Sequence, residues 1–583
     1  MSQNPELRPK KQGILPTPRL SVCFLLIFSL VGSLFAGKSH NVEAGAAGGF
    51  DREYRLDSLF ADYKDMAGPG VAVALVYDNE LVFSKGYGSA NLEYNIPVDP
   101  SSTIFHIASV SKQFTVFAAM LLEEAGKLSM EDDVREYIPE VPDFGETITL
   151  KDLAAHTGGL RDQWNLLGMA GWRLDDVITL EHVMKLVEHQ QALNFSPGEE
   201  YLYSNTGFTL LAEVVARVSG QSFAEFTDEH IFQPLGMENT LFYDDHRKIV
   251  PGRAYSYHSY NNGYRKSVLS YANVGATSLF TTVEDLSLWV KNFHETKVGT
   301  PEIFDEMNTE VTLHDGSTFG GALGQFVSNY KGLYQISHGG ADAGFRTYLG
   351  RFPDHHAAVI LFSNYAGFNS RDMAMQVADI FLEEHLTGPL VPAAELIDTE
   401  VPDAEELESF TGAYWNDQRK YAATVELQED TLRYRSGGTR HTLAPVGRHT
   451  FYVPGDSRQL IFTFAKSLDD PAMVMTANND MPVSYTRYSP REYDEDELTE
   501  YTGAYYSEEL GTVYTFKVKE GRLTATHRRH SDISFGPLKE DTFQGDRWYF
   551  RTVQFERDEA GSISGMYVSS GRVRDLWFEK RKE

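Results

Sequence analysis

Cysteine is almost absent from this sequence of 583 residues, and the single one, Cys23, lies in an apolar run near the amino terminus. A disulfide needs two cysteines and a thiolate zinc site usually needs more, so both are excluded. Cationic residues are also scarce, with 52 Lys and Arg against 83 Asp and Glu and a formal net charge of −31. Nucleic acid and anionic membrane surfaces repel a chain this acidic, so we expect neither as a partner.

Long apolar runs are absent after the first 36 residues. Basic residues up to Arg19 precede an uncharged apolar segment from Leu20 to Ala36, and small residues follow it. This order is typical of a secretory signal peptide. We therefore predict a cleaved signal at residues 1–36, with an uncleaved membrane anchor as the alternative, and an exported protein, either periplasmic or secreted. The alanine- and glycine-rich residues 37–49 are predicted to form a flexible leader.

The rest of the chain can bury ordinary cores, since 42% of the sequence is apolar and 13% is aromatic. The pattern of residues 70–88 predicts a β-hairpin that turns at Asp78 and Asn79, and further strands are predicted around residues 320–363. Between them the apolar spacing is helical, with the clearest example at Val110, Phe114, Phe117 and Leu121. Strands at both ends of a helical middle predict a sheet-containing lobe that is interrupted by a helical lobe.

The chain beyond about residue 400 contains an internal repeat. ELESFTGAYW at Glu406 matches ELTEYTGAYY at Glu497, 91 positions later, and Leu432 matches Leu523 at the same offset. A constant offset predicts two tandem all-β modules, each a small barrel or sandwich. We place them at residues 405–490 and 495–583, after a linker at residues 389–404. The sequence leaves open whether they close as two barrels or as one joint barrel.

An S-x-x-K motif, Ser109-Val-Ser-Lys112, lies at the start of the first predicted helix. Residues i and i+3 share one helical face, so the lysine can reach the serine hydroxyl. Free backbone N–H groups at a helix start also favour a developing oxyanion. A second match, Ser328 to Lys331, lies in a predicted strand–turn–strand segment. In a strand, residues i and i+3 point to opposite faces, so this lysine cannot reach the serine. We therefore take Ser109 as the candidate nucleophile.

Two further motifs follow along the chain. Tyr203-Ser-Asn205 supplies a phenol that can act as a general base and an amide that can orient a lysine or a substrate. His338-Gly339-Gly340 lies on a predicted strand, where two glycines permit close approach of a substrate backbone. Each motif is weak in isolation.

Together and in this order, the motifs resemble those of the penicillin-recognising serine hydrolases, which include class C β-lactamases, D-aminopeptidases, DD-peptidases and related esterases. Relatives carry S-x-x-K, S-D-N and K-T-G, and this chain has S-V-S-K, Y-S-N and H-G-G. LAAHTGGL from Leu153 and PLGM at Pro234 are similar as well. The resemblance covers residues 50–388. It implies a two-lobed β-lactamase/transpeptidase-like domain of α/β plus α type, with the site between its lobes and the two small all-β modules after it.

The resemblance also implies a role for each motif residue. Ser109 is the acylated nucleophile and Lys112 is its activator. Tyr203 is the base that activates the deacylating water, and Asn205 is an orienting amide. His338 takes the place of the K-T-G lysine. The oxyanion is bound by the N–H groups of Ser109 and Ala341, on the substrate-binding strand that contains Gly339 and Gly340.

The third motif departs from the β-lactamase pattern. Gly339 has no hydroxyl and His338 is mostly neutral near pH 7, so a drug carboxylate loses two contacts and efficient penicillin hydrolysis is not expected. We therefore predict an exported serine hydrolase that forms an acyl-enzyme on Ser109 and hydrolyses peptides or amides containing D-amino acids. The alternatives are a promiscuous carboxylesterase or weak β-lactamase, and a catalytically idle protein that binds cell-wall peptide. Serine catalysis needs no metal or cofactor, and we predict none.

Three smaller features are interpreted with their alternatives. The basic loop from His527 to His530 is either a lid over the cleft or a solvated hairpin tip. His156 to Gly159 is expected to form a turn near the cleft. Arg346 either meets a substrate carboxylate or forms a salt bridge on a strand.

Overall fold

The computed structural model describes residues 52–388, 401–454, 456, 460–465, 472–477 and 481–582. The predicted signal peptide (1–36), the leader (37–49) and most of the linker (389–400) lie outside the described residues. In the part of the chain that is described, no helix is long and apolar enough to cross a membrane.

The predicted hairpin at residues 70–88 is confirmed. Strands β1 (Val71–Tyr77) and β2 (Glu80–Tyr87) pair in antiparallel fashion, with a two-residue turn between them. Asp78 and Asn79 in that turn have φ angles of 50° and 62°. This is the left-handed conformation that tight hairpin turns require, and Asp and Asn tolerate it better than most residues.

One antiparallel sheet joins the two ends of this domain, in the order β12-β13-β14-β15-β16-β1-β2. Its later strands are β12 (Gly321–Ala322), β13 (Gln325–Tyr330), β14 (Leu333–Asp342), β15 (Phe345–Phe352) and β16 (Ala357–Ser363). β1 pairs with β16 in the register Val71 to Ser363. The early hairpin and the late strands therefore form a single sheet, as the sequence predicts.

Helices cover both faces of this sheet. Helix α11 (Ser370–Phe381) packs on one face, where Leu56 and Phe60 complete an apolar cluster. A 3₁₀ turn (Glu383–His385) follows this helix. Helix α9 (Val283–Glu295) contacts β1, β2 and β16, and its core residues belong to a separate cluster on the opposite face.

The helical lobe is built around α2 (Lys112–Glu124), which packs against α6 (Asn205–Ser219). A 3₁₀ turn (Ala108–Ser111) leads directly into α2 and carries Ser109. The other helices are α3 (Leu150–Ala155), α4 (Gln163–Met169), α5 (Leu180–Glu188), α7 (Phe223–Thr227), α8 (Gln233–Leu235) and α10 (Pro301–Asn308). The short strands are β3 (Ser89–Asn91), β4 (Ile96–Pro97), β5 (Phe105–His106), β6 (Ile178–Thr179), β7 (Leu241–Phe242), β8 (Ser256–Tyr260), β9 (Gly263–Ser267), β10 (Tyr271–Ala272) and β11 (Leu279–Thr281).

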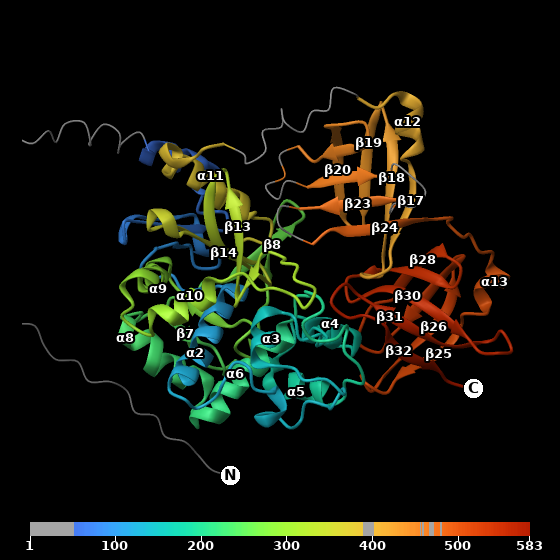
Figure 1. The fold of residues 1–583 in the computed structure, drawn as a ribbon, viewed down its shortest axis with the longest axis horizontal. Coiled ribbons are helices and arrows are strands. Elements are labelled where there is room, and N and C mark those ends of the chain that lie inside the picture. The colour runs from blue at the N-terminus through green and yellow to red at the C-terminus, as the bar shows by residue number, and fades with distance from the viewer. Residues whose placement is uncertain are drawn as a thin grey trace, which may run out of the picture. The chain divides into compact units, whose positions relative to one another are not determined.

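The repeated modules form two closed eight-stranded barrels, which answers the question that the sequence leaves open. The first contains β17 (Gly412–Asn416), β18 (Tyr421–Gln428), β19 (Thr431–Ser436), β20 (Thr439–Pro445), β21 (Thr450–Tyr452), β22 (Ile461–Phe464), β23 (Met473–Thr476) and β24 (Val483–Tyr488). The second contains β25 (Gly503–Ser507), β26 (Thr512–Lys519), β27 (Arg522–Thr526), β28 (Ile533–Lys539), β29 (Thr542–Arg547), β30 (Phe550–Arg557), β31 (Ile563–Ser569) and β32 (Leu576–Lys580). Orange and red strands distinguish them in Figure 1.

The repeated sequence has a structural reason. In each module it forms a short helix, α12 (Ala404–Ser409) or α13 (Glu495–Thr499), that begins with an aspartate capping box and leads into the first strand. In each, a buried tyrosine of that strand donates a hydrogen bond to a carbonyl four residues earlier. The pairs are Tyr414 to Phe410 at 2.6 Å and Tyr505 to Tyr501 at 2.9 Å. The repeat thus encodes the same helix-to-strand junction twice.

Candidate active site

Ser109 lies in a turn with an uncommon backbone conformation. Its neighbour Ala108 has a φ of 49°, which is costly for a residue with a Cβ. Strand β14 packs directly against this turn: a Cβ at Gly340 would lie 2.3 Å from the Ile107 carbonyl oxygen. A Cβ at Gly339 would meet nothing closer than 3.8 Å. Gly340 is therefore required by the contact between the strand and the nucleophile turn, whereas a Cβ at Gly339 would make only ordinary van der Waals contacts.

Lys112 is fully buried, and its Nζ has three oxygen partners. They are Ser109 Oγ at 3.1 Å, Asn205 Oδ1 at 2.9 Å and the carbonyl oxygen of Ala276 at 2.7 Å. Burial lowers the pKa of Lys112 to about 7, so a neutral amine is accessible near neutral pH. A neutral amine has two hydrogens, and the Asn205 and Ala276 oxygens can only accept them. The lone pair is then left facing the Ser109 hydroxyl.

Asp162 fixes the amide of Asn205, and the sequence analysis does not include it. The buried carboxylate Oδ2 accepts hydrogen bonds from Asn205 N at 2.8 Å and from Asn205 Nδ2 at 2.7 Å. Its Oδ1 accepts from Trp164 N at 3.0 Å, which caps helix α4. Because Nδ2 is committed to the carboxylate, Oδ1 of Asn205 must face Lys112. An aspartate shortly before a helix is the available sequence signal, and by itself it indicates only an N-cap.

Tyr203 lies beside the nucleophile. Its phenol is hydrogen-bonded to Ser109, and Lys112 Nζ lies 4.9 Å from the centre of its ring. His156 stacks on the other side, with ring centres 4.0 Å apart and planes at 28°. Burial raises the pKa of Tyr203 well above its ordinary value. A neutral phenol is therefore favoured at the pH of ordinary assays, while the role of general base that the resemblance implies for Tyr203 stays a prediction.

His338 presents an unprotonated nitrogen to this tyrosine. Its Nδ1 lies 2.6 Å from the Gly339 carbonyl oxygen, which can only accept, so Nδ1 carries the proton. Nε2 faces the Tyr203 hydroxyl at 3.5 Å. Burial and the neighbouring Lys112 lower the pKa of His338 to about 3. His338 is thus a neutral acceptor and not a replacement for the charge of a lysine.

The motif residues meet at one cleft of about 630 Å³. Seven of the eight candidate residues line it, namely Ser109, Tyr203, Asn205, His338, Gly339, Gly340 and Ala341. Lys112 lies beneath the surface and reaches the cleft through Ser109. The structure therefore brings together every residue that the three motifs predict, while their individual roles stay predictions.

The second barrel reaches this cleft through a loop that the sequence analysis missed. Arg572, between β31 and β32, lines the cleft, and its guanidinium lies 4.5 Å from the centre of the Tyr203 ring. The backbone of this loop is held in place, because Asp162 N donates to the Arg572 carbonyl at 3.2 Å. A buried ion pair between Arg161 and Glu509, at 2.6 Å, joins the same two parts of the chain.

The loop from His527 to His530 does not form the predicted lid. His530 Nε2 contacts the Gly168 carbonyl at 2.8 Å, and Arg529 pairs with Asp176 at 2.6 Å. These contacts attach the loop to α4 and the segment after it, away from the residues that line the cleft. The clustered charge pointed to the barrel that does reach the cleft, but to a loop that does not line it. Charge alone does not show which loop of a barrel faces the site.

The two smaller candidates have clear places in the structure. His156 ends helix α3 with a φ of 63°, so the predicted turn is present and its ring supports Tyr203. Arg346 lines the cleft and donates to the backbone carbonyls of Ala343 and Phe345, at 3.2 Å and 2.7 Å. The nearby carboxylate of Asp342 is instead held by Thr277 and by His106, the latter at 2.9 Å.

The described residues contain no group of three or more His, Cys, Asp or Glu side chains that is arranged to hold a metal ion. The cleft places a serine hydroxyl within hydrogen-bond distance of a buried amine, and serine-based nucleophilic catalysis requires such a pair.

Comparison with known proteins agrees with this geometry. The family model for beta-lactamase matches residues 56–384, more than half of the chain. The chain belongs to the beta-lactamase family. It is an enzyme of the serine hydrolase class, as the motifs predict.

Relatives extend the similarity into the barrels. A D-aminopeptidase of Gluconobacter oxydans (strain 621H) is 25% identical over 531 residues, which cover 88% of this chain and 96% of the relative. Penicillin-binding protein 4* of Bacillus subtilis (strain 168) is 26% identical, over 71% of this chain and 95% of its own. The octameric penicillin-binding protein homologue from Pyrococcus abyssi has a similar fold, with a TM-score of 0.52 at 21% identity, over 84% of this chain and 100% of its own. The predicted fold class of a β-lactamase-like domain with two all-β modules is confirmed.

Proposed function

We propose that this protein is an exported hydrolase of peptides or amides containing D-amino acids, acting through an acyl-enzyme on Ser109. The observation that carries the proposal is the contact between the Lys112 amine and the Ser109 hydroxyl at 3.1 Å, inside the cleft that the three motifs share. A D-aminopeptidase that matches the chain across both the catalytic domain and the barrels supports the substrate class.

Acylation follows from the hydrogen-bond pattern. Lys112 Nζ accepts the Ser109 hydroxyl proton as Oγ attacks the substrate carbonyl carbon. The carbonyl oxygen becomes an oxyanion, which the N–H groups of Ser109 and Ala341 stabilise. The tetrahedral intermediate then breaks its bond to the leaving nitrogen. That nitrogen takes up the proton through the Tyr203 phenol, which is hydrogen-bonded to Ser109.

Deacylation uses the same groups in reverse. A water molecule replaces the leaving group, gives its proton to the Lys112 amine through the Tyr203 phenol, and attacks the ester carbonyl. The bond to Ser109 Oγ breaks, and Oγ recovers a proton from Lys112. Tyr203 works here as a neutral relay whose hydroxyl is positioned between Ser109 and His338 Nε2.

The charges that line the cleft favour a particular group of substrates. Three guanidinium groups line it, those of Arg346, Arg371 and Arg572, against the one carboxylate of Asp342, which already has two partners. The Nε of Arg371 is buried and has no hydrogen-bond partner among the described residues. Guanidinium groups bind carboxylates, whereas a substrate ammonium needs an anion. A D-amino-acid carboxypeptidase is therefore a second candidate beside the aminopeptidase.

Substitution of two of the three cleft arginines, one at a time, tests the second candidate. For Arg346→Gln and Arg371→Gln we expect KM for acetyl-D-alanyl-D-alanine to rise about tenfold, the loss of one charge-assisted contact. D-Alanine p-nitroanilide, which has no carboxylate, serves as the matched control, and its KM should not change. Steady-state kinetics on both substrates separate the effects. An equal rise for the two substrates would contradict carboxylate recognition.

Asp162→Asn tests the positioning of Asn205. The carboxylate accepts two hydrogen bonds from Asn205 and raises the pKa of Lys112 by its charge. We expect kcat to fall about a hundredfold, within the range for a misaligned catalytic group, and the acidic limb of the pH–rate profile to shift to lower pH. A purely structural residue would reduce the folded fraction without moving that limb. A fall in kcat with an unchanged limb, measured on folded protein, would contradict the positioning role.

The same assays distinguish the alternatives within the family. Turnover of p-nitrophenyl esters without turnover of any D-alanyl amide or peptide would indicate a carboxylesterase. A stable mass adduct with penicillin would show that a drug carboxylate is recognised despite Gly339. Saturable binding of cell-wall peptide without acylation or turnover would indicate the idle binding protein.

A further inference from the structure

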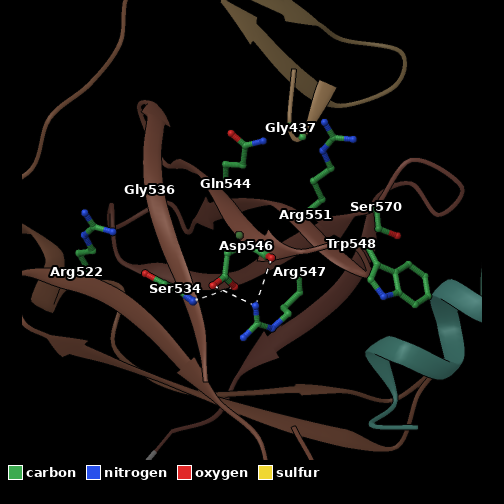
Figure 2. Close-up of a pocket in the computed structure, with 12 residues that line it drawn as sticks. Gly437, Arg522, Ser534, Gly536, Gln544, Asp546, Arg547, Trp548, Arg551 and Ser570 are labelled. Carbon is green, nitrogen blue, oxygen red and sulfur yellow. Dashed lines mark hydrogen bonds and ion pairs between the residues drawn. The ribbon is translucent and has the colours of Figure 1, made fainter. Parts of the chain in front are cut away.

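A second pocket lies on the outer face of the second barrel, apart from the catalytic cleft. It has a volume of about 610 Å³, and nine of its twelve lining residues belong to strands β27–β30 or to the turns between them. The other three are Ser570, directly after β31, and Gly437 and Gly438, in the turn between β19 and β20 of the first barrel. Side chains of Ser534, Gln544 and Arg551 project into it, and Gly536 lies across from Gln544 in the strand pairing. Nothing lies within 4 Å of the position that a Cβ at Gly536 would take, so the space above this glycine is free for a ligand. Figure 2 shows the labelled residues.

An exposed tryptophan forms one side of this pocket. Trp548 is 48% exposed, although large aromatic rings are usually buried. It lies in the two-residue turn between β29 and β30, next to Tyr549, which is buried against His530 at 4.8 Å between ring centres. A Cβ at Gly168 of α4 would lie 2.7 Å from the Tyr549 Cβ, so Tyr549 packs directly on that helix. The turn is anchored by one aromatic residue and presents the other outward.

The pocket is cationic although the protein is strongly acidic. Three arginines line it, Arg522, Arg547 and Arg551, against the single carboxylate of Asp546. Asp546 pairs with Arg547 at 3.3 Å, so this charge is compensated. Arg551 contacts Ser436 Oγ at 3.4 Å and lies over the Tyr421 ring at 5.4 Å from its centre, and neither contact supplies a negative charge. The Arg522 guanidinium has no hydrogen-bond or ion-pair partner within the described part of the chain. In a chain of charge −31, two uncompensated guanidinium groups in one pocket indicate an anionic ligand.

The combination of groups fits one chemical class. The apolar C–H face of a sugar ring stacks on an indole, and planar polar side chains such as Gln544 and Asp546 bind neighbouring hydroxyls. The outer faces of other small barrels, such as OB-folds, bind oligosaccharides. The uncompensated arginines add a requirement for a carboxylate. We propose that this pocket binds an acidic glycan, a chain of sugar rings that carry carboxylates.

The position of the pocket relates it to the cleft. Ser570 lines the pocket, and Arg572, two residues later, lines the catalytic cleft. Asn165 of α4 donates to the Ser570 carbonyl and hydroxyl oxygens, both at 2.9 Å, which holds this segment on the catalytic domain. A glycan in the pocket would place a peptide attached to it near Ser109. This last step rests on the proposed hydrolysis of D-amino-acid peptides, whereas the binding itself does not.

The binding test uses the full chain with Ser109→Ala, so that turnover cannot consume the probe. The probe is a peptide-free glycan of alternating N-acetylglucosamine and N-acetylmuramic acid, which has one carboxylate per disaccharide. Chitotetraose is the neutral control with similar rings. By isothermal calorimetry we expect saturable binding of the acidic glycan, at least tenfold weaker binding of chitotetraose, and at least tenfold weaker acidic-glycan binding after Trp548→Ala or Arg522→Gln.

Matched variants and a second readout keep the test decisive. Arg528→Gln removes an arginine of the same barrel that does not line the pocket, and it should bind the glycan normally. When they are made in the protein that retains Ser109, Trp548→Ala and Arg522→Gln should leave D-alanine p-nitroanilide turnover unchanged. Unchanged turnover also shows that both variants fold. Absence of glycan binding, or binding that neither variant weakens, would overturn the proposal. Equal binding of chitotetraose would overturn the requirement for a carboxylate. Binding that depends on Trp548 in a protein without any hydrolase activity would leave this proposal standing and refute the proposed function.

Discussion

Ser109→Ala is expected to reduce turnover of D-alanine p-nitroanilide by about 10⁴-fold or more, since covalent catalysis then has no nucleophile. The alanine removes the one hydroxyl oxygen that Lys112 contacts inside the cleft. No other serine that lines the cleft lies near this amine: Ser370 is the second one, and its Oγ donates to the Thr347 carbonyl at 3.1 Å. Stopped assays and intact mass both report the change, because the acyl adduct should disappear as well.

The chain provides a matched control for this substitution. Ser328 and Lys331 form the other S-x-x-K match, but Ser328 lies on strand β13 and contacts Gln335 at 3.2 Å, while Lys331 pairs with Asp379 at 2.7 Å. Ser328→Ala should therefore leave turnover unchanged. Retained turnover in Ser109→Ala, or an adduct mapped to another residue, would contradict the assignment of the nucleophile.

Local sequence patterns predicted those parts of the site that depend on local geometry. The spacing of Ser109 and Lys112 is enough to predict their contact, because both lie where α2 begins. The glycines of the third motif likewise indicate close approach of a backbone in any fold. The reason for Gly340 was nevertheless different from the prediction, since the strand approaches the nucleophile turn itself. The two-lobed fold and the tandem all-β modules were predicted from strand-like sequence patterns and a constant repeat offset. Both kinds of pattern can be identified without knowledge of the tertiary structure.

The features that were missed depend on contacts between distant parts of the chain. Asp162 and Asn205 are 43 positions apart, and Arg572 comes from a different domain than the tyrosine it covers. No spacing rule connects such residues. Closure of each barrel likewise depends on pairing of its first and last strands, β17 with β24 and β25 with β32, which a repeat cannot show. The lid prediction at residues 527–530 failed for the same reason.

The pH–rate profile of kcat/KM is expected to have an acidic limb with an apparent pKa of about 7, which belongs to Lys112. The sign follows from the form that reacts: the neutral amine accepts the proton, so activity is present above the pKa and is lost as the pH falls through it. An exposed lysine with a pKa near 10.4 would be neutral in about one molecule in 2,500 at pH 7, whereas at a pKa of 7 half of the molecules are neutral. Because the pKa of Tyr203 is raised, the rate should then be level between about pH 8 and 10.

Removal of the amine gives the second large effect. Lys112→Ala should lower kcat by about 10³-fold, within the range for a general base, and should abolish the acidic limb. Added methylamine should restore part of the rate in proportion to its free-base concentration, because the substitution leaves space where Nζ contacted Asn205 and Ala276. A structural role for Lys112 would not be rescued by a soluble amine. Tyr203→Phe is the matched variant: it should lower kcat through loss of the relay but keep the limb near pH 7. If the wild-type rate instead keeps rising above pH 10, a phenolate at Tyr203 is the base, and the assignment to Lys112 is wrong.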